Sequence, residues 1–334
     1  MTLCTAFIRR ANDTEELVFA TDSCLTGGEK WKHGIKLFEL PRKDCLLCFA
    51  GNTMRAYPLV LNLISSIHLN SYLQSPASRL EEVLTYLSEL FTELVKKIIS
   101  EIVGEDIHVL RGEAKFIFGG WDWEKGCFRI WKLYYSKEVE GFIFDELTDK
   151  NKTRFYTFLG DAANNVEGLA FMKYKQMLLA EDIQDDPIDM EPLRILRDIA
   201  LDSKIREVDG SLQIAKVYRS NRVEFFGVYW ESSKGKPCFQ GREYNEINKP
   251  LVRYINPDTF EILESDLPEK LVDITEEVYG DNINFVTDCY NEEGYLKADL
   301  PEKSKHLLRS IFKDVAYRLF VKSQNEEPAK TEEE

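Results

Sequence analysis

Short apolar runs separated by turn residues open the chain, and they predict four successive β-strands within roughly the first fifty residues. Each run is too short for a helix and rich in residues that favour strands. The predicted strands are TLCTAFIRR, LVFATD, GIKLFEL and DCLLCFAG, and the segment ANDTEE and a Gly-Gly loop form the turns between them.

Two helical patterns follow these strands. The first, TMRAYPLVLNLISSIHL, has an apolar face at helical spacing, and we expect Pro58 in its first turn, where a missing N–H costs little. The second, SRLEEVLTYLSELFTELVKKIISEIVG, also repeats apolar residues at helical spacing. Ser78 and Glu81 predict a capping box before the second helix, and Gly104 predicts its end.

Strands and helix pairs alternate in the rest of the pattern. AKFIFGGWDW, CFRIWKLYY and RFYTFLG predict strands, AANNVEGLAFMKYKQMLL and MEPLRILRDIALDSKI predict helices around the loop AEDIQDDPIDM, and SLQIAKVYRSNRVEFFGVYW predicts a hairpin. Because each sheet must bury both faces, this order favours two antiparallel sheets packed face to face with a helix pair outside each. The expected fold class is α+β, a four-layer αββα sandwich.

A change of texture after Trp230 predicts a domain boundary, with the first domain at residues 1–231. The segment ESSKGKPCFQGREYNEINKP is polar and rich in loop residues. The C-terminal extension at 232–324 holds one amphipathic helix, KSKHLLRSIFKDVAYRLFV, and no motif that assigns it a role. The acidic tail NEEPAKTEEE at 325–334 lacks apolar anchors and is expected to be disordered.

Charge and hydropathy exclude two classes of partner. A net charge of −15, from 43 basic and 58 acidic residues, argues against a nucleic-acid surface, which needs clustered Lys and Arg. No apolar run approaches the ~18 residues that span a bilayer. We therefore expect a cytoplasmic protein that contacts no membrane.

Cysteine and histidine positions predict neither disulfides nor a metal site. Seven cysteines, an odd number, suit a reducing compartment. The close pair Cys45 and Cys48 should face opposite sides of a strand and form part of the core instead of binding zinc. The four histidines are scattered along the chain. We expect no metal and no cofactor.

Four positions near the start of the chain carry the candidate chemistry. Thr2 follows the initiator Met, Asp22 ends the second strand in FATDS, Lys36 lies in GIKLF and Gly51 lies in FAGN. Each residue alone is ordinary for a turn, a strand edge or a loop. In this order and spacing they resemble the opening of the proteasome β-subunit family of N-terminal nucleophile (Ntn) hydrolases, and the Met-Thr-x-Cys start is most similar to the bacterial ancestral β-subunit (Anbu) group.

The resemblance extends more weakly over about the first 231 residues. GGWDWEKGCFRIWKLYY, FLGDAANNV and REVDGSLQIAKVY are similar to later segments of the family. Three departures concern the groups that support the nucleophile. Asp161 stands where the family usually has a Ser, Asp209 and Ser211 are spaced by two residues instead of three, and Glu207 competes with Asp209 for the acidic role.

The resemblance implies a role for each of the four positions. Removal of Met1 makes Thr2 the nucleophile, and its α-amine, with an ordinary pKa of about 7.7–8.0, serves as the general base. Lys36 favours the Thr2 alkoxide, Asp22 holds Lys36 charged and in place, and the Gly51 N–H binds the developing oxyanion.

Two other residues remain candidates for the nucleophile position. The first hairpin, RRANDTEEL, is longer than the usual turn of the family, so an alignment on that turn gives Leu3 or Cys4 the nucleophile position instead of Thr2. Thr2 is preferred because ordinary processing makes it N-terminal. Cys4 is otherwise expected in the core or a pocket wall, and Cys24 in a turn or in the specificity pocket.

The expected function is a threonine-type endopeptidase acting on peptides or unfolded proteins. A non-peptide amide substrate and a non-catalytic role as an assembly subunit are the alternatives. The family resemblance and the apolar surface of the first two predicted helices imply a homo-oligomer. Neither the cleavage preference nor an ATPase partner follows from the sequence.

Overall fold

A computed structural model describes the following residues of the chain: 2–11, 14–26, 29–75, 77–100, 104, 106–148, 154–160, 165–245, 249–250, 252–263, 267–268, 271, 275–297 and 299–325. The chain divides into two compact units, residues 1–261 and 262–334. Both units contain helices, and the first also contains extended antiparallel sheets. The expected mixture of antiparallel strands and helices is confirmed.

The larger sheet of the first unit brings the two ends of its sequence together. Its strands run in the order β10-β1-β2-β11-β12-β13-β14, every neighbouring pair is antiparallel, and β15 lies parallel to β12. Their bounds are β1 Leu3–Ala11, β2 Thr14–Thr21, β10 Tyr156–Gly160, β11 Gln213–Tyr218, β12 Arg222–Trp230, β13 Lys236–Phe239, β14 Arg242–Glu243 and β15 Tyr254–Ile255.

A second antiparallel sheet contains strands in sequence order, β5-β6-β7-β8-β9. They span Leu37–Glu39, Cys45–Gly51, Ala114–Asp122, Cys127–Ser136 and Gly141–Glu146. A short ribbon of β3 (Leu25–Thr26) and β4 (Lys30–Trp31) precedes them. The strands expected in the first fifty residues are therefore confirmed, whereas the sequence analysis missed the short ribbon and β9.

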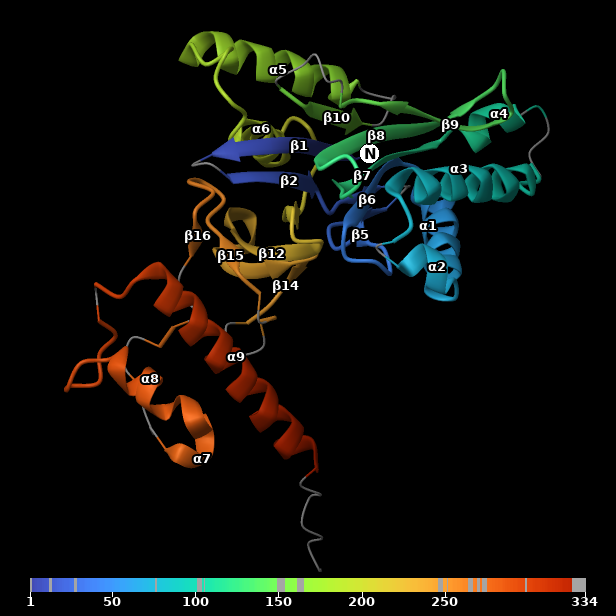
Figure 1. Ribbon diagram of the computed structural model, residues 1–334. Helices are drawn as coiled ribbons and strands as arrows, with labels where there is room; N and C mark the ends of the chain where they lie inside the picture. Colours follow the sequence, from blue (N-terminus) through green and yellow to red (C-terminus); the bar gives the residue numbers. More distant parts are fainter. Residues whose placement is uncertain are drawn as a thin grey trace, which may run out of the picture. The chain divides into compact units, whose positions relative to one another are not determined.

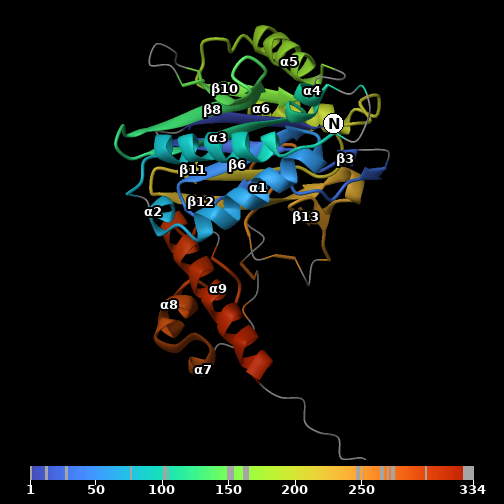
Figure 2. The same ribbon diagram turned by 90° about the vertical axis from the view of Figure 1, so that its right-hand side faces the viewer.

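Helices of the first unit group into two pairs with short helices beside them (Figures 1 and 2). The long ones are α1 Thr53–His68, α3 Leu80–Lys96, α5 Val166–Glu181 and α6 Glu191–Leu201, and the short ones are α2 Ser71–Gln74, α4 Ile107–Arg111 and the 3₁₀ turn Glu231–Ser233. Pro58 lies inside α1 and beyond its first turn, so that expectation is wrong. Asn52 caps the helix by accepting a hydrogen bond from Met54 N at 2.9 Å.

The ends of α3 differ from the prediction. The helix begins at Leu80, and the Glu82 carboxylate accepts a hydrogen bond from Arg79 N at 2.8 Å, so the expected box of Ser78 and Glu81 is wrong by one residue. The helix stops at Lys96, well before Gly104, and the Arg111 guanidinium donates a hydrogen bond to the carbonyl of Val95 at 3.1 Å. Backbone N–H groups and a side chain from α4, not a glycine, satisfy the carbonyls at this end.

Three buried clusters show how the elements of this unit pack. One joins residues of β1, β2 and β11 to residues of β6, β7 and β8, so the two sheets share a core. A second packs α5 and α6 against the larger sheet, and a third packs α1 and α3 against the smaller sheet. Figure 1 shows α5 and α6 beside β1 and β10, and α3 and α1 beside β6.

Strand β6 illustrates why its residues take these positions. Cys45 belongs to the cluster under α1 and α3, whereas Cys48 belongs to the cluster between the sheets, because neighbouring side chains of a strand alternate between its faces. The prediction that the two cysteines face opposite sides is confirmed. Burial raises the pKa of both thiols well above the ordinary range, which makes them poor nucleophiles.

The larger sheet continues past residue 231, where the sequence analysis ended the first domain. β13 pairs with β12, and Cys238 and Ile255 join the same buried cluster as Trp230. These short strands lie in a polar, turn-rich segment, which gives little periodic signal.

The second unit has a small core of its own. Its helices are α7 Glu276–Tyr279, α8 Ile283–Asp288 and α9 Glu302–Asn325, with a 3₁₀ turn at Gly280–Asn282 and a short strand, β16, at Ile262–Leu263. Val286 and Leu308 are fully buried in this core. Helix α9 confirms the helix expected from KSKHLLRSIFKDVAYRLFV. The expected disordered tail, apart from Asn325, lies outside the described residues. Among those described, no helix is long and apolar enough to span a membrane.

Candidate active site

A buried ion pair lies at the centre of the candidate site. Lys36 Nζ is 2.9 Å from each carboxylate oxygen of Asp22, and both side chains are fully buried. Asp22 directly follows β2, and Lys36 directly precedes β5, so the pair links the two sheets. An ion pair removed from water is maintained only when its remaining hydrogen-bonding capacity is also satisfied.

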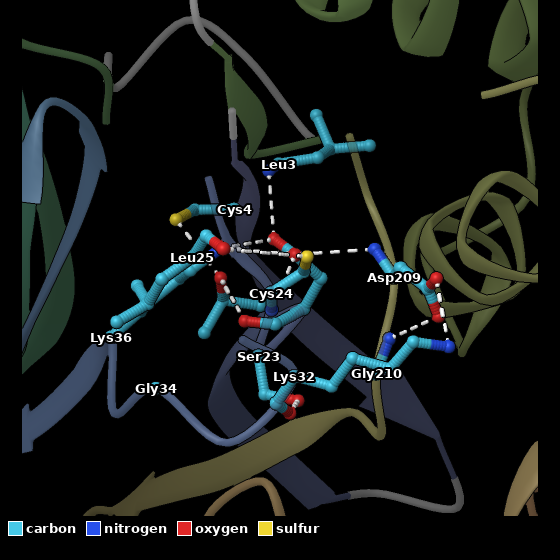
Figure 3. Close-up of polar contacts among 12 residues, drawn as sticks. Leu3, Cys4, Ser23, Cys24, Leu25, Lys32, Gly34, Lys36, Asp209 and Gly210 are labelled. Atoms are coloured by element: carbon cyan, nitrogen blue, oxygen red, sulfur yellow. Dashed lines mark hydrogen bonds and ion pairs between the residues drawn. The ribbon is translucent and has the colours of Figure 1, made fainter. Parts of the chain in front are cut away.

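Backbone groups complete the shell of the Asp22 carboxylate. Oδ1 accepts a hydrogen bond from Leu3 N at 3.1 Å, and Oδ2 accepts bonds from Cys24 N at 3.0 Å and Asp209 N at 3.4 Å. These donors come from three separate segments (Figure 3). Asp22 thus holds the start of β1, the turn after β2 and the segment before β11 around one lysine.

The register of the first hairpin determines which residue stands beside this pair. Cys4 pairs with Thr21, so Leu3 lies opposite Asp22 and Thr2 is the residue just before it. The Leu3 N–H, which forms the peptide bond with Thr2, and Lys36 Nζ lie within 3.1 Å of the same carboxylate oxygen. Thr2 is buried, with 2% of its surface exposed. The long hairpin therefore leaves Thr2 next to the Asp22–Lys36 pair.

Leu3 and Cys4, the two alternative candidates for the nucleophile position, are packed in the buried cores. Leu3 is fully buried in the cluster that contains α5 and α6. Cys4 lies between the sheets, where its thiol donates to the carbonyl of Phe49 at 2.9 Å. Cys24 is buried, and burial raises the pKa of its thiol. These contacts suit structural side chains better than a nucleophile.

Gly51 ends β6 at the edge of a pocket of about 670 Å³, which we call the Gly51 pocket. Its backbone has φ of +111°, and a Cβ at this position would lie 1.9 Å from the carbonyl oxygen of Glu113, so only glycine fits. The walls come from the β3–β4 ribbon, the start of α1, α4 and the end of β10. The lining residues are Leu25, Thr26, Glu29, Trp31, Ala50, Gly51, Asn52, Thr53, Met54, Val109, Gly112, Glu113, Lys115 and Gly160.

The pocket adjoins the start of β1. Gly160, which lines the pocket, pairs with Leu3 in the sheet. Ala50, another lining residue, follows Phe49, whose carbonyl binds the Cys4 thiol. A ligand in the Gly51 pocket would therefore lie beside the strand end that carries Thr2.

Asp209 meets the site through its backbone, and its carboxylate is engaged elsewhere (Figure 3). Oδ2 binds Lys30 Nζ at 2.5 Å and Lys32 Nζ at 3.0 Å. Burial by itself raises the pKa of this carboxyl, but the hydrogen bonds from Lys30 and the Gly210 N–H outweigh it, so the pKa lies below its ordinary value. Asp209 thus anchors the ribbon that forms one wall of the Gly51 pocket.

The remaining expected site residues are less closely connected to the ion pair. Ser211 is buried, and its hydroxyl has no hydrogen-bond partner in the described part of the chain. Glu207 is partly buried. Asp161 lies outside the described residues. The structure therefore brings together Thr2, Asp22 and Lys36, with Gly51 at the adjoining pocket.

Sequence analysis missed Gln213, which fixes the backbone of Lys36. Its side-chain oxygen accepts hydrogen bonds from Lys36 N at 3.0 Å and Leu37 N at 3.2 Å, and its amide donates to the Gly34 carbonyl at 2.5 Å. Gln213 is 1% exposed. A polar residue within the apolar run SLQIAKVY was the available signal, because a buried amide must be hydrogen-bonded.

No cluster of three or more metal-ligating side chains occurs in the portion of the chain that the structure describes.

Comparisons with known proteins yield structural relatives only. No family model and no curated protein matches the chain. Among solved structures, it is similar to Anbu (ancestral beta-subunit) from Yersinia bercovieri, with 16% identity and a TM-score of 0.45 over 67% of this chain and 86% of that one. It is also similar to the helical assembly of the Anbu complex from Pseudomonas aeruginosa, with 17% identity and a TM-score of 0.45 over 65% of this chain and 81% of the other. The resemblance to Anbu indicated by the sequence is thus also found among solved structures.

Proposed function

We propose that the chain is a threonine-type endopeptidase in which Thr2, once it is N-terminal, is both nucleophile and base. The observation that carries the proposal is the fully buried Asp22–Lys36 pair. One carboxylate oxygen of Asp22 accepts hydrogen bonds both from Lys36 Nζ and from the N–H of Leu3, the residue after Thr2. Burial of such a pair adds less to stability than an apolar pair of the same volume would. A chemical role gives a reason to keep it.

Lys36 supplies positive charge where the reaction needs it. An ammonium beside the Thr2 hydroxyl favours the alkoxide, and it disfavours protonation of the neighbouring α-amine because like charges repel. Asp22 binds the ammonium with both carboxylate oxygens in a fully buried site, and Gln213 holds the lysine backbone. The low local dielectric strengthens each of these interactions.

The reaction proceeds by acyl transfer. The Thr2 α-amine takes the hydroxyl proton as Oγ attacks the peptide carbonyl carbon, and the Gly51 N–H stabilises the oxyanion. The C–N bond then breaks, the leaving amine receives the proton, and an ester on Thr2 remains. Water attacks the carbonyl carbon of this ester and gives one proton to the α-amine. The bond from this carbon to Oγ then breaks, the amine returns the proton to Oγ, and the carboxylic acid product leaves Thr2 free.

The fold proposed for this site is the four-layer αββα sandwich of Ntn hydrolases. The core shared by the two sheets and the helix pair on each outer face support it. The extension at 232–324 has no assigned role in catalysis.

We also propose that the protein forms a homo-oligomer. Large apolar side chains are exposed on the first helices, including Met54 (77%), Leu61 (58%) and Leu69 (85%). Large exposed apolar side chains are candidates for burial at a contact between subunits. In such an assembly Thr2 would act on peptides or unfolded segments.

The proposal is tested by Thr2→Ala, with Thr2→Ser as the matched control. Thr2→Ala removes one hydroxyl and little apolar area, so we expect an unchanged thermal transition and complete loss of fluorogenic peptide hydrolysis. Thr2→Ser keeps a hydroxyl and should retain measurable turnover. Intact-mass spectrometry of each sample shows whether Met1 is absent. Equal hydrolysis by Thr2→Ala and the parent chain would remove Thr2 from the mechanism.

A further inference from the structure

A second pocket shares the lining residue Trp31 with the Gly51 pocket. It has a volume of about 620 Å³, and we call it the Arg242 pocket. Trp31 lines both pockets and is 63% exposed. The lining residues are Trp31, His33, Ile35, Phe239, Gln240, Arg242, Glu243 and Tyr244. The wall therefore combines residues of and after β4 with residues of the β13–β14 turn. The sequence analysis placed this turn outside the first domain.

The β13–β14 turn is fixed to the candidate active site. His33 Nδ1 and the carbonyl oxygen of Gly241 are 2.7 Å apart. Gly241 has φ of +81°, and a Cβ there would lie 2.6 Å from Cβ of Ser23, the residue after Asp22. Ser23 in turn donates to the Lys32 carbonyl at 2.7 Å. Because these contacts already hold the wall in place, a ligand need not order it on binding.

Arg242 has unused capacity for an anion. Its guanidinium makes no ion pair within the described residues, and its one recorded interaction is with the Tyr244 ring, 4.9 Å from the centroid. Glu243, the acidic residue of this pocket, is instead bound by Ser233 Oγ at 2.6 Å and lies 3.9 Å from Lys236 Nζ. An arginine free to form a bidentate pair is well suited to a carboxylate.

Gln240 adds an acceptor to the same wall. Its buried side-chain oxygen has no hydrogen-bond partner among the residues that the structure describes. A buried acceptor left unpaired costs free energy, which a ligand N–H would recover. A peptide offers both an N–H and a carboxylate side chain.

The two pockets differ in charge. The Gly51 pocket contains Glu29, Lys115 and Glu113, whose carboxylate is paired with Arg55 at 3.2 Å, whereas the Arg242 pocket contains Arg242 with the engaged Glu243. In a chain of net charge −15, a wall with a free arginine is a local exception. Electrostatic complementarity favours an anion at this wall.

We infer that the Arg242 pocket is a second side-chain subsite, which binds an aspartate or glutamate of a peptide whose neighbouring residues occupy the Gly51 pocket. The inference rests on the proposed function, because it takes the Gly51 pocket as the site of the scissile bond. Arg242 binds the carboxylate, Gln240 accepts a peptide N–H, and Trp31 packs between the two bound side chains. Arg242 is thus a specificity residue.

The test measures binding separately from cleavage. Pairs of fluorescein-labelled peptides differ by a single Asp or Asn, and this residue is placed at each peptide position in turn. Each peptide is titrated with the full-length Thr2→Ala chain, and binding is measured by fluorescence anisotropy. At one position the Asp peptide should bind at least ~10-fold more tightly, the size of one charge-assisted pair. Arg242→Gln should abolish that difference, and Arg242→Glu should reverse it in favour of a Lys peptide.

Arg222→Gln is the matched control, since Arg222 is an exposed arginine of β12 outside both pockets. It should preserve the Asp preference. No preference at any position, no detectable binding, or a preference that survives Arg242→Gln would overturn the inference. Hydrolysis by the parent chain is measured separately. If the Asp preference depends on Arg242 but no peptide is hydrolysed, the proposed function is contradicted and the subsite stands. If peptides are hydrolysed but no such preference is found, the subsite is contradicted and the proposed function stands.

Discussion

Asp22 is the residue on which the candidate site depends most. A buried carboxylate costs several kcal/mol unless its oxygens are paired, and here Lys36 and three backbone N–H groups pair them. Those N–H groups belong to Leu3, Cys24 and Asp209, which no local sequence pattern connects. The charge that keeps Lys36 in place therefore also brings the three segments together.

Lys36→Met should separate the chemical role of the lysine from its structural role. Loss of the ammonium leaves Asp22 as an unpaired buried charge, so we expect a decrease of about 3–5 kcal/mol in the free energy of unfolding, measured by urea titration. Peptide hydrolysis per folded molecule should decrease at least ~100-fold, because the hydroxyl loses its activating charge. Lys36→Arg should not restore the rate, since a planar fork does not replace a compact ammonium.

Lys43→Met, on an exposed lysine, is the matched control and should change neither quantity. If Lys36→Met unfolded more readily yet kept the full rate, Lys36 would be a structural residue and the proposed mechanism would lose its cation.

Among the elements, α3 shows how one carboxylate can fix a helix end. Glu81 in its first turn accepts hydrogen bonds from Lys125 at 2.8 Å and Arg129 at 2.6 Å, which belong to the β7–β8 turn and to β8. These bonds, that of Lys125 first, lower the pKa of Glu81 to about 2. A carboxyl whose pKa falls on folding stabilises the protein above its ordinary pKa and loses this effect as the pH falls.

Glu81→Gln should therefore lower stability at pH 7 and have less effect at acidic pH. The difference in urea midpoint between the parent chain and this variant should narrow as the pH falls from about 4.5 towards 2, the range between the two pKa values. Glu89→Gln, at an exposed position of the same helix, should show no such trend. A difference in urea midpoint that did not change with pH over this range would mean that the contacts with Lys125 and Arg129 do not lower the pKa of Glu81.

The strands and helices also show which parts of the fold could be predicted from the sequence. Periodicity identified most long strands and both helix pairs, because buried faces repeat at two residues or about 3.6. It missed β9, β13 and β14, whose runs are short or polar. Thr2, Asp22 and Lys36 were predicted as site residues from a family resemblance, and the structure places Asp22 beside Lys36 and beside the N–H that follows Thr2. Gln213 and the anchoring of Lys30 to Asp209 were not predicted, since both depend on contacts across roughly 180 residues.

At the scale of the whole molecule, the account predicts a homo-oligomer. An exposed apolar surface on α1 and the following turn would be costly to leave in water. We expect light scattering coupled to size exclusion at micromolar concentration to give a mass that is a multiple of 38.8 kDa. Charge substitution of Met54 and Leu61 should shift the population towards single chains. A single species near 38.8 kDa for the parent chain would contradict the oligomer.

The central claim is that Thr2 reacts as an N-terminal residue, and labelling by a peptide epoxyketone tests it most directly. This probe forms a ring with both the hydroxyl and the α-amine of an N-terminal threonine. Peptide mapping by mass spectrometry should find one adduct, on Thr2 of a chain that lacks Met1, and none on Thr2→Ala or on Cys4. An adduct elsewhere, or no adduct on a folded chain whose Thr2 amine is shown to be free, would contradict the account.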